Sequence, residues 1–131
     1  MEPRMNTNKH EIIYKDLSYQ IIKASFEVHN ILGAGFLEKV YENALIIKLR
    51  QYGIKAEQQV PAKVCFEGET VGEYYADIVV DNKIILELKC VELITPIHEA
   101  QLINYLKATG MKLGMILNFA RPKFEYRRIV L

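Results

Sequence analysis

The stretch that decides the fold of this 131-residue chain is residues 76–89, Ala-Asp-Ile-Val-Val-Asp-Asn-Lys-Ile-Ile-Leu-Glu-Leu-Lys. Its two apolar runs flank a polar break and have the length and composition of β-strands. Three charged residues, Asp77, Glu87 and Lys89, interrupt these runs. A charge in a buried strand is costly unless it is paired or bound to a metal. We therefore expect each of these three charges to be paired with an opposite charge or to contact a metal.

Asp77 and Glu87 share a sheet face in only one register of the predicted hairpin. With a three-residue loop over 81–83, Asp77 lies opposite Glu87, and Lys89 lies on the same face. A two-residue loop would move Asp77 to the other face. The sequence leaves both loops open, and we adopt the register that joins the carboxylates. Two carboxylates and an ammonium on one face could hold a divalent cation and orient a water.

The composition is that of an ordinary globular domain, with half of the residues hydrophobic and a net charge of +1. We predict a flexible tail over 1–15 and a single domain over 16–131. The N-terminus lacks the apolar core of a signal peptide, and no apolar run approaches the roughly 20 residues of a membrane span. Cys65 and Cys90 lack zinc-binding spacing, and we expect buried free thiols. These features predict a cytoplasmic protein with no membrane partner.

Hydrophobic periodicity predicts an α/β fold with the element order α-α-β-β-β-β-α-β-β. The expected helices are 16–32, 37–52 and 97–108, and the expected strands are 58–66, 70–75, 76–80, 84–91, 112–119 and 125–131. Asp16 or Ser18 is the expected cap of the first helix. The residues expected on the inner faces of the first two helices are Leu17, Ile21, Ala24, Val28, Ile31, Val40, Ala44 and Ile47, with Leu45 and Leu49 as further candidates.

Two helical segments carry further candidate site residues. Gln101 and Tyr105 share a helix face and could point at the cation site. Alternatively, Tyr105 packs in the core with Gln101 at its rim. His98, one turn earlier, could face the same site or the solvent.

Glu38 lies in the first turn of its predicted helix, where the helix dipole favours a negative charge. In a functional role it would be a further acid near the metal, supported by Tyr41 and Glu42 one turn later. His29 in the preceding helix could reach the same cleft.

The C-terminal segment is a candidate surface for nucleic acid. A local basic patch is enough to attract phosphates even when the net charge is close to zero. The alternative is a solvated edge strand. The patch consists of Arg121, Lys123, Arg127 and Arg128.

Taken together, these motifs resemble the GxxExxY family, a branch of the PD-(D/E)XK nuclease superfamily. The resemblance covers residues 16–131. It rests on the order of six segments: Gly35-Phe36-Leu37-Glu38-Lys39-Val40-Tyr41, Ala76-Asp77, Leu86-Glu87-Leu88-Lys89, His98-Glu99-Ala100-Gln101, Tyr105-Leu106-Lys107, and Gly114 through Asn118-Phe119.

The resemblance implies a restriction-endonuclease-like core with a central mixed β-sheet flanked by helices. It implies hydrolysis of phosphodiester bonds in DNA with Mg²⁺ or Mn²⁺. The metal ligands would be Asp77, Glu87 and the backbone carbonyl of Leu88, with Lys89 as the charge stabiliser. The remaining catalytic positions would be Glu38, Gln101 and Tyr105.

Two further questions stay open at this point. The chain could be a catalytically silent module that keeps the fold and binds nucleic acid or a protein partner. A homodimer would place two sites on two strands. The residues do not decide between DNA and RNA.

Overall fold

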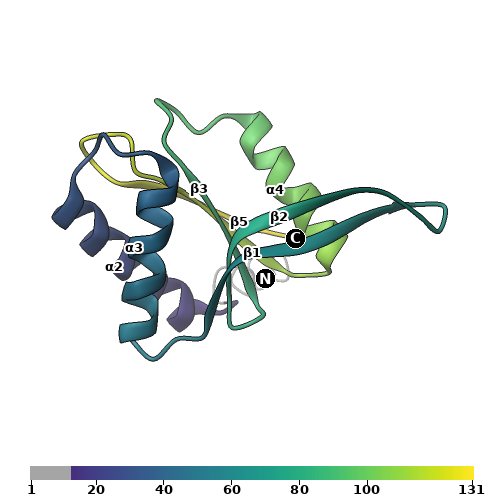
Figure 1. The fold of residues 1–131 in the computed structure, drawn as a ribbon, viewed down its shortest axis with the longest axis horizontal. Helices are drawn as coiled ribbons and strands as arrows, with labels where there is room; N and C mark the ends of the chain where they lie inside the picture. Colours follow the sequence, from purple (N-terminus) through teal and green to yellow (C-terminus); the bar gives the residue numbers. More distant parts are fainter. Residues whose placement is uncertain (1–12) are drawn as a thin grey trace, which may run out of the picture.

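Five strands form one mixed sheet, and their order across the sheet follows the chain, β1-β2-β3-β4-β5 (Figure 1). The structure is a computed structural model that describes residues 13–131, so most of the predicted tail, residues 1–12, lies outside the described residues. The elements are α2 (Lys15–Leu32), α3 (Glu38–Gln51), β1 (Ala56–Phe66), β2 (Glu69–Val80), β3 (Ile84–Lys89), α4 (Pro96–Thr109), β4 (Leu113–Asn118) and β5 (Glu125–Val130). Neighbouring strands are antiparallel except β3 and β4, which are parallel and joined through α4.

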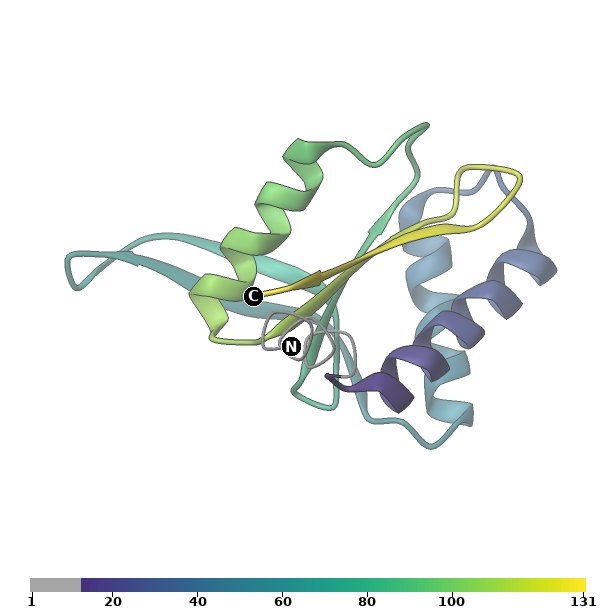
Figure 2. The ribbon, with the colours of Figure 1, turned by 180° about the vertical axis from the view of Figure 1, so that it is seen from behind.

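The helices cover both faces of the sheet. Helices α2 and α3 pack on one face, around Ile21, Leu45 and Leu86. Helix α4 packs on the other, where Leu102 and Leu106 meet Ile85 and Ile116 (Figure 2). Strands β3 and β4 and the inner end of β2 are therefore mostly buried on both sides, as their apolar runs predict. The predicted α/β core with a flanked mixed sheet is confirmed.

One predicted strand boundary is wrong. The segments 70–75 and 76–80 form a single strand, β2, which stays paired with β1 from Glu69 to Val80. No turn residue separates Tyr75 from Ala76, so nothing ends the strand there. The observed order is therefore α-α-β-β-β-α-β-β. The outer part of this hairpin, residues 61–75, extends beyond the body of the domain and is called the hairpin arm below (Figure 1).

The register between β2 and β3 is the one that requires a three-residue loop. Ile78 pairs with Leu86 and Val80 with Ile84, which leaves residues 81–83 as the loop. Asp81 and Asn82 adopt φ values of 51° and 55°, a left-handed conformation that Asp and Asn tolerate in tight hairpin turns. The Lys83 amide closes the turn by donating to the Val80 carbonyl at 2.9 Å.

The start of α2 also differs from the prediction. The helix begins at Lys15 after Tyr14, whose φ is 51°, and no side chain caps it, so the proposed caps Asp16 and Ser18 are wrong. The C-terminal end of the predicted inner face is wrong as well, because Ile31 is 73% exposed.

Helix α3 presents a partly different face to the core than predicted, although the further candidates Leu45 and Leu49 are buried as expected. Its buried residues are Tyr41, Glu42, Leu45, Ile46 and Leu49, whereas Val40 and Ile47 are exposed. Tyr41 accounts for this orientation. Its ring stacks on Phe119 with centroids 4.7 Å apart, and its hydroxyl donates to the Gly33 carbonyl at 2.6 Å. Residues one and two turns after Tyr41 then fall on the inner face.

The predicted burial of the cysteines is not observed. Cys65 is exposed and Cys90 is half-buried, and both thiols are free. Cys65 lies in the hairpin arm, where the C-terminal part of α4 lies beside the strands but leaves the Cys65 side chain exposed. Within residues 13–131, no helix is both long and apolar enough to cross a membrane.

Candidate active site

The two central carboxylates meet where β2 separates from β3. The paired residues end at Ile78 and Leu86, one position short of Asp77 and Glu87. There the Asp77 amide donates to Oε2 of Glu87 at 3.1 Å, and the Leu88 amide donates to Oδ2 of Asp77 at 2.8 Å. Side-chain oxygens thus accept from amides next to the end of the strand pairing. These two hydrogen bonds fix the positions of both carboxylates relative to each other.

Burial raises the pKa values of both acids, and the charge of Asp77 adds to the rise at Glu87. The pKa of Glu87 rises from its ordinary 4.5 to about 8, chiefly because the side chain is desolvated and secondly because Asp77 is close. Burial also raises the pKa of Asp77, while the hydrogen bond from the Leu88 amide lowers it. The pair therefore carries negative charge that the surrounding protein compensates only in part.

Lys89 supplies a positive charge beside the pair. It ends β3, two residues after Glu87, and it is half-buried. Its charge lowers the pKa values of both Asp77 and Glu87. An ammonium in this position can stabilise negative charge that develops on a group bound at the two carboxylates.

The structure adds a third carboxylate that the sequence indicated only as a supporting residue. Glu42 on α3 is only 4% exposed. It accepts hydrogen bonds from Lys39 at 3.1 Å, Gln58 at 2.8 Å and Gln59 at 3.1 Å. Its charge raises the pKa values of Asp77 and Glu87, so Glu42 lies within electrostatic reach of the pair.

Gln59 connects Glu42 to Asp77. The sequence did not predict this role. Its side chain bonds to Glu42, and a hydrogen bond from Gln59 lowers the pKa of Asp77. Its φ of 53° lies in the left-handed region, which is strained for a residue with a side chain. No local pattern around Gln59 signals this conformation, because Gly, Asn or Asp would be the usual residues there.

Glu38, the acid suggested by the family resemblance, contacts a different group. It is exposed at the start of α3, and its Oε2 accepts from the Cys90 amide at 3.1 Å. It therefore binds the chain directly after β3. Glu42 lies one helical turn later on the same face, and this spacing is the signal that could have identified it.

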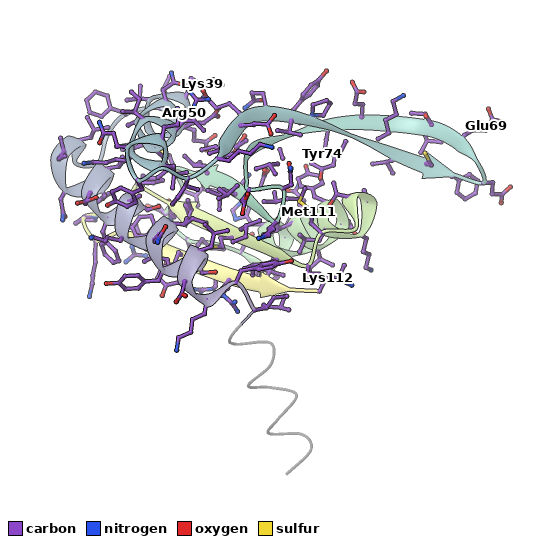
Figure 3. All side chains as sticks on the ribbon, turned by 90° about the horizontal axis from the view of Figure 1, so that it is seen from below. Lys39, Arg50, Glu69, Tyr74, Met111 and Lys112 are labelled. Carbon is purple, nitrogen blue, oxygen red and sulfur yellow. The ribbon has the colours of Figure 1, made fainter. Side chains whose placement is uncertain are left out.

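Tyr105 reaches the site from the opposite layer. It stacks on Tyr74 of β2 with ring centroids 3.6 Å apart, and the Tyr74 hydroxyl donates to the Tyr105 carbonyl at 3.3 Å. The pKa of Tyr105 is raised, first by burial and then by the charges of Glu87 and Asp77. Gln101 is exposed one turn earlier on α4. Figure 3 shows Tyr74 between the hairpin and α4.

The two histidine candidates have structural partners. His98 belongs to the capping box of α4, where its Nδ1 accepts from the Thr95 amide at 3.1 Å. His29 is buried, and its Nε2 lies 2.8 Å from the Arg121 carbonyl oxygen. The ring of His29 packs near Phe119 on the α2 side of the sheet.

Three of the four C-terminal basic residues contact other parts of the protein. Arg127 forms an ion pair with Glu99 at 3.3 Å. Arg121 donates to the Glu92 carbonyl at 3.0 Å, and Arg128 donates to the Ile13 carbonyl. Lys123 is exposed.

The donor set suits a hard divalent cation. Among the described residues, no group of three or more His, Cys, Asp or Glu side chains is arranged to hold a metal ion. Mg²⁺, however, commonly uses one or two carboxylates and keeps several waters. Asp77 and Glu87 provide two such carboxylates, and the raised pKa of Glu87 reflects charge that a cation would compensate. The residues present therefore fit the metal.

Comparisons with known proteins point to one superfamily. The family model described as the PD-(D/E)XK nuclease superfamily matches residues 15–129. Among solved structures, the crystal structure of SSO0001 is similar with a TM-score of 0.55 and 21% identity, and the match covers 93% of this chain and 59% of that one. The chain thus spans about three fifths of that protein, and the likeness concerns the fold. No curated protein matches the chain.

Weaker matches are two structures of an alkaline exonuclease, LHK-Exo, from Laribacter hongkongensis, one of them in complex with dAMP. Each has a TM-score of 0.47 and 13% identity, and each match covers 82% of this chain and 75% of the other.

Proposed function

Because the chain belongs to the PD-(D/E)XK nuclease superfamily, we propose that it is a metal-dependent nuclease that hydrolyses phosphodiester bonds in DNA. The observation that carries this proposal is the paired arrangement of Asp77 and Glu87 beside Lys89. Their carboxylates are joined through the amides of Asp77 and Leu88 where β2 and β3 diverge. A purely structural ion pair would not require two neighbouring acids whose pKa values are both raised.

In this proposal Asp77, Glu87 and the backbone carbonyl of Leu88 would hold Mg²⁺ or Mn²⁺. When bound, such a metal polarises the phosphate and lowers the pKa of a coordinated water. The amides of Asp77 and Leu88 keep the two carboxylates oriented. Lys89 orients the attacking water and stabilises the negative charge that develops on the phosphate.

The remaining candidate residues act around this centre. Tyr105 and Gln101 face the substrate from α4, on the side opposite to α3. Glu42 adds negative charge that favours cation binding, and Gln59 holds Glu42 and Asp77 in place. Glu38 fixes the chain after Lys89 through the Cys90 amide.

A cleavage assay tests the proposal. Purified protein is incubated with Mg²⁺ or Mn²⁺ and with single-stranded, duplex, flap and branched DNA and RNA. We expect cutting that stops with a chelator and falls by at least about 100-fold in Glu87→Gln. The matched control is Glu92→Gln, which changes an exposed acid other than Asp77, Glu87 and Glu42. This variant should cut like the wild type.

Two outcomes would contradict the proposal. Cutting that persists in Glu87→Gln would place the activity elsewhere. A wild-type protein that binds metal but cuts nothing in the panel would favour the catalytically silent binding module.

A further inference from the structure

A groove separates the hairpin arm from α4. It encloses about 660 Å³. The arm contributes Lys63 and Val64 to its wall, and α4 contributes Asn104, Tyr105 and Lys107. Figures 1 and 2 show the arm running beside the C-terminal half of α4.

The groove leads to the carboxylates through a pair of tyrosines. Tyr105 lines the groove and stacks on Tyr74. Tyr74 lies three residues before Asp77 in β2 and opposite Ala62, the neighbour of Lys63, in β1. The phenol of Tyr105 also lies within electrostatic reach of Glu87 and Asp77, because their charges contribute to its raised pKa. The groove therefore opens beside the stretch of β2 that leads to Asp77.

The wall of the groove has the chemistry of a nucleic-acid site. Two of its lining residues are lysines and none is acidic, so the groove attracts phosphates. Val64 and the ring of Tyr105 add apolar surface, and Asn104 adds a side chain that both donates and accepts hydrogen bonds. A basic groove with aromatic surface is the combination that binds single strands without a sequence preference.

The volume of the groove suits a short stretch of a single strand. A cavity of 660 Å³ falls within the range of about 300–1,000 Å³ that encloses a small ligand. It has room for a nucleotide or two of one strand. The charged groups on the C-terminal surface are less available, because Arg121, Arg127 and Arg128 already contact protein groups.

We propose that this groove binds a single strand of nucleic acid, with Lys63 and Lys107 on its phosphates, and directs it to Asp77 and Glu87. The inference deepens the proposed nuclease function, on which it rests, by assigning a single-stranded substrate segment. Binding in the groove does not itself require cleavage, so the two proposals can fail separately.

Fluorescence anisotropy in the presence of a chelator tests the groove without cleavage. The probes are a labelled oligothymidine of about 12 nucleotides, within the range of sites on single-strand binders, the corresponding RNA, and a blunt duplex of the same length. We expect the wild type to bind a single strand at least about tenfold more tightly than the duplex. Preference for the DNA or the RNA strand identifies the sugar, and either preference supports the groove.

The double variant Lys63→Gln/Lys107→Gln should weaken single-strand binding. The slope of log affinity against log salt concentration should fall by about 1.4, which corresponds to about 0.7 for each lost phosphate contact on a single strand. Lys63→Arg/Lys107→Arg should restore the affinity because it restores the charge. Lys123→Gln, which removes an exposed charge of the C-terminal patch, should leave the slope unchanged.

Three results would contradict the proposal that the groove binds a single strand. They are an unchanged slope in the double glutamine variant, a larger loss in Lys123→Gln, and duplex binding as tight as single-strand binding. If the wild type cuts DNA while the groove variants bind normally, the groove fails and the nuclease proposal stands. If the groove binds as expected and no substrate is cut, the nuclease proposal fails and the groove stands.

Discussion

Strand β2 passes through two environments that differ in how deeply its side chains are buried. From Ala76 to Val80 most of the strand is buried, with helices over both faces. From Glu69 to Tyr75 it is almost entirely exposed, in the hairpin arm. Figure 3 shows Glu69 at the far end of the arm, distant from the helices. Asp77 lies at the junction between the two parts.

The junction explains why charged residues are tolerated in an apolar strand. At this position the acids are buried enough for their pKa values to rise, yet they remain open to a ligand that arrives along the arm. Deeper in the sheet, an unpaired carboxylate would be too costly. Farther out on the arm, solvent would screen it and leave it unperturbed. The site therefore depends on the contrast between body and arm, and each prediction below tests one side of that contrast.

The largest effect is expected for Lys89→Ala, at the junction. Turnover should fall by at least about 100-fold, because the charge that develops on the phosphate loses the ammonium group that stabilises it. Affinity for a single-stranded oligonucleotide, measured by anisotropy, should change by less than about threefold, the loss of one phosphate contact at most. An equal loss of turnover and affinity would instead assign Lys89 a binding role.

The second prediction compares the contributions of a body residue and an arm residue to the free energy of unfolding. Ile85 is fully buried under α4, whereas Val71 on the arm is 63% exposed. Ile85→Ala should lower the free energy of unfolding by about 2–5 kcal/mol, and Val71→Ala should change it by less than about 0.5 kcal/mol. Urea denaturation measures both. A comparable loss in Val71→Ala would show that the arm is packed in solution.

A third effect concerns the pH dependence of stability in the metal-free protein. The pKa of Glu87 is 4.5 ordinarily and about 8 in the folded protein. Between these values the folded state binds a proton that the unfolded chain has lost, so stability falls as the pH rises. Thermal melts in a chelator should show this decline from pH 4.5 to about 8, and Glu87→Gln should decline less. Identical profiles for the two proteins would contradict the raised pKa.

The smallest effect distinguishes the two acids of α3. Glu42→Gln removes a buried charge near Asp77 and Glu87 and should weaken Mg²⁺ or Mn²⁺ binding about fivefold, equivalent to about 1 kcal/mol at intermediate dielectric. Glu38→Gln should weaken it less, because Glu38 is exposed and binds the Cys90 amide. Metal titration of the activity compares them. A larger effect of Glu38→Gln would favour the role that the family resemblance implies.

The sequence was sufficient to predict the strand segments that are buried on both faces. Both apolar runs of the β2–β3 hairpin are buried on both faces, so their composition alone indicates covered strands. The constraint that Asp77 and Glu87 share a face then selects the loop of three residues that is observed. The parallel strand β4, buried throughout, was predictable for the same reason.

Residues whose positions depend on distant contacts were not predictable. The inner face of α3 is set by Tyr41, which packs on Phe119 some eighty residues later. Cys65 is exposed because it lies in the hairpin arm, a property of the tertiary arrangement rather than of local sequence. Gln59 takes a left-handed φ that its residue type disfavours, and the contacts that impose it come from α3 and β2.

The most direct test of the central claim is a calorimetric titration of the metal-free protein with Mn²⁺. If Asp77 and Glu87 form the metal centre, the wild type binds Mn²⁺ and Asp77→Asn binds it at least about tenfold more weakly, because one of two carboxylate ligands is lost. Asp81→Asn, in the hairpin loop, serves as the matched control and should bind like the wild type. Equal binding by the wild type and Asp77→Asn, or no binding by the wild type, would contradict the account.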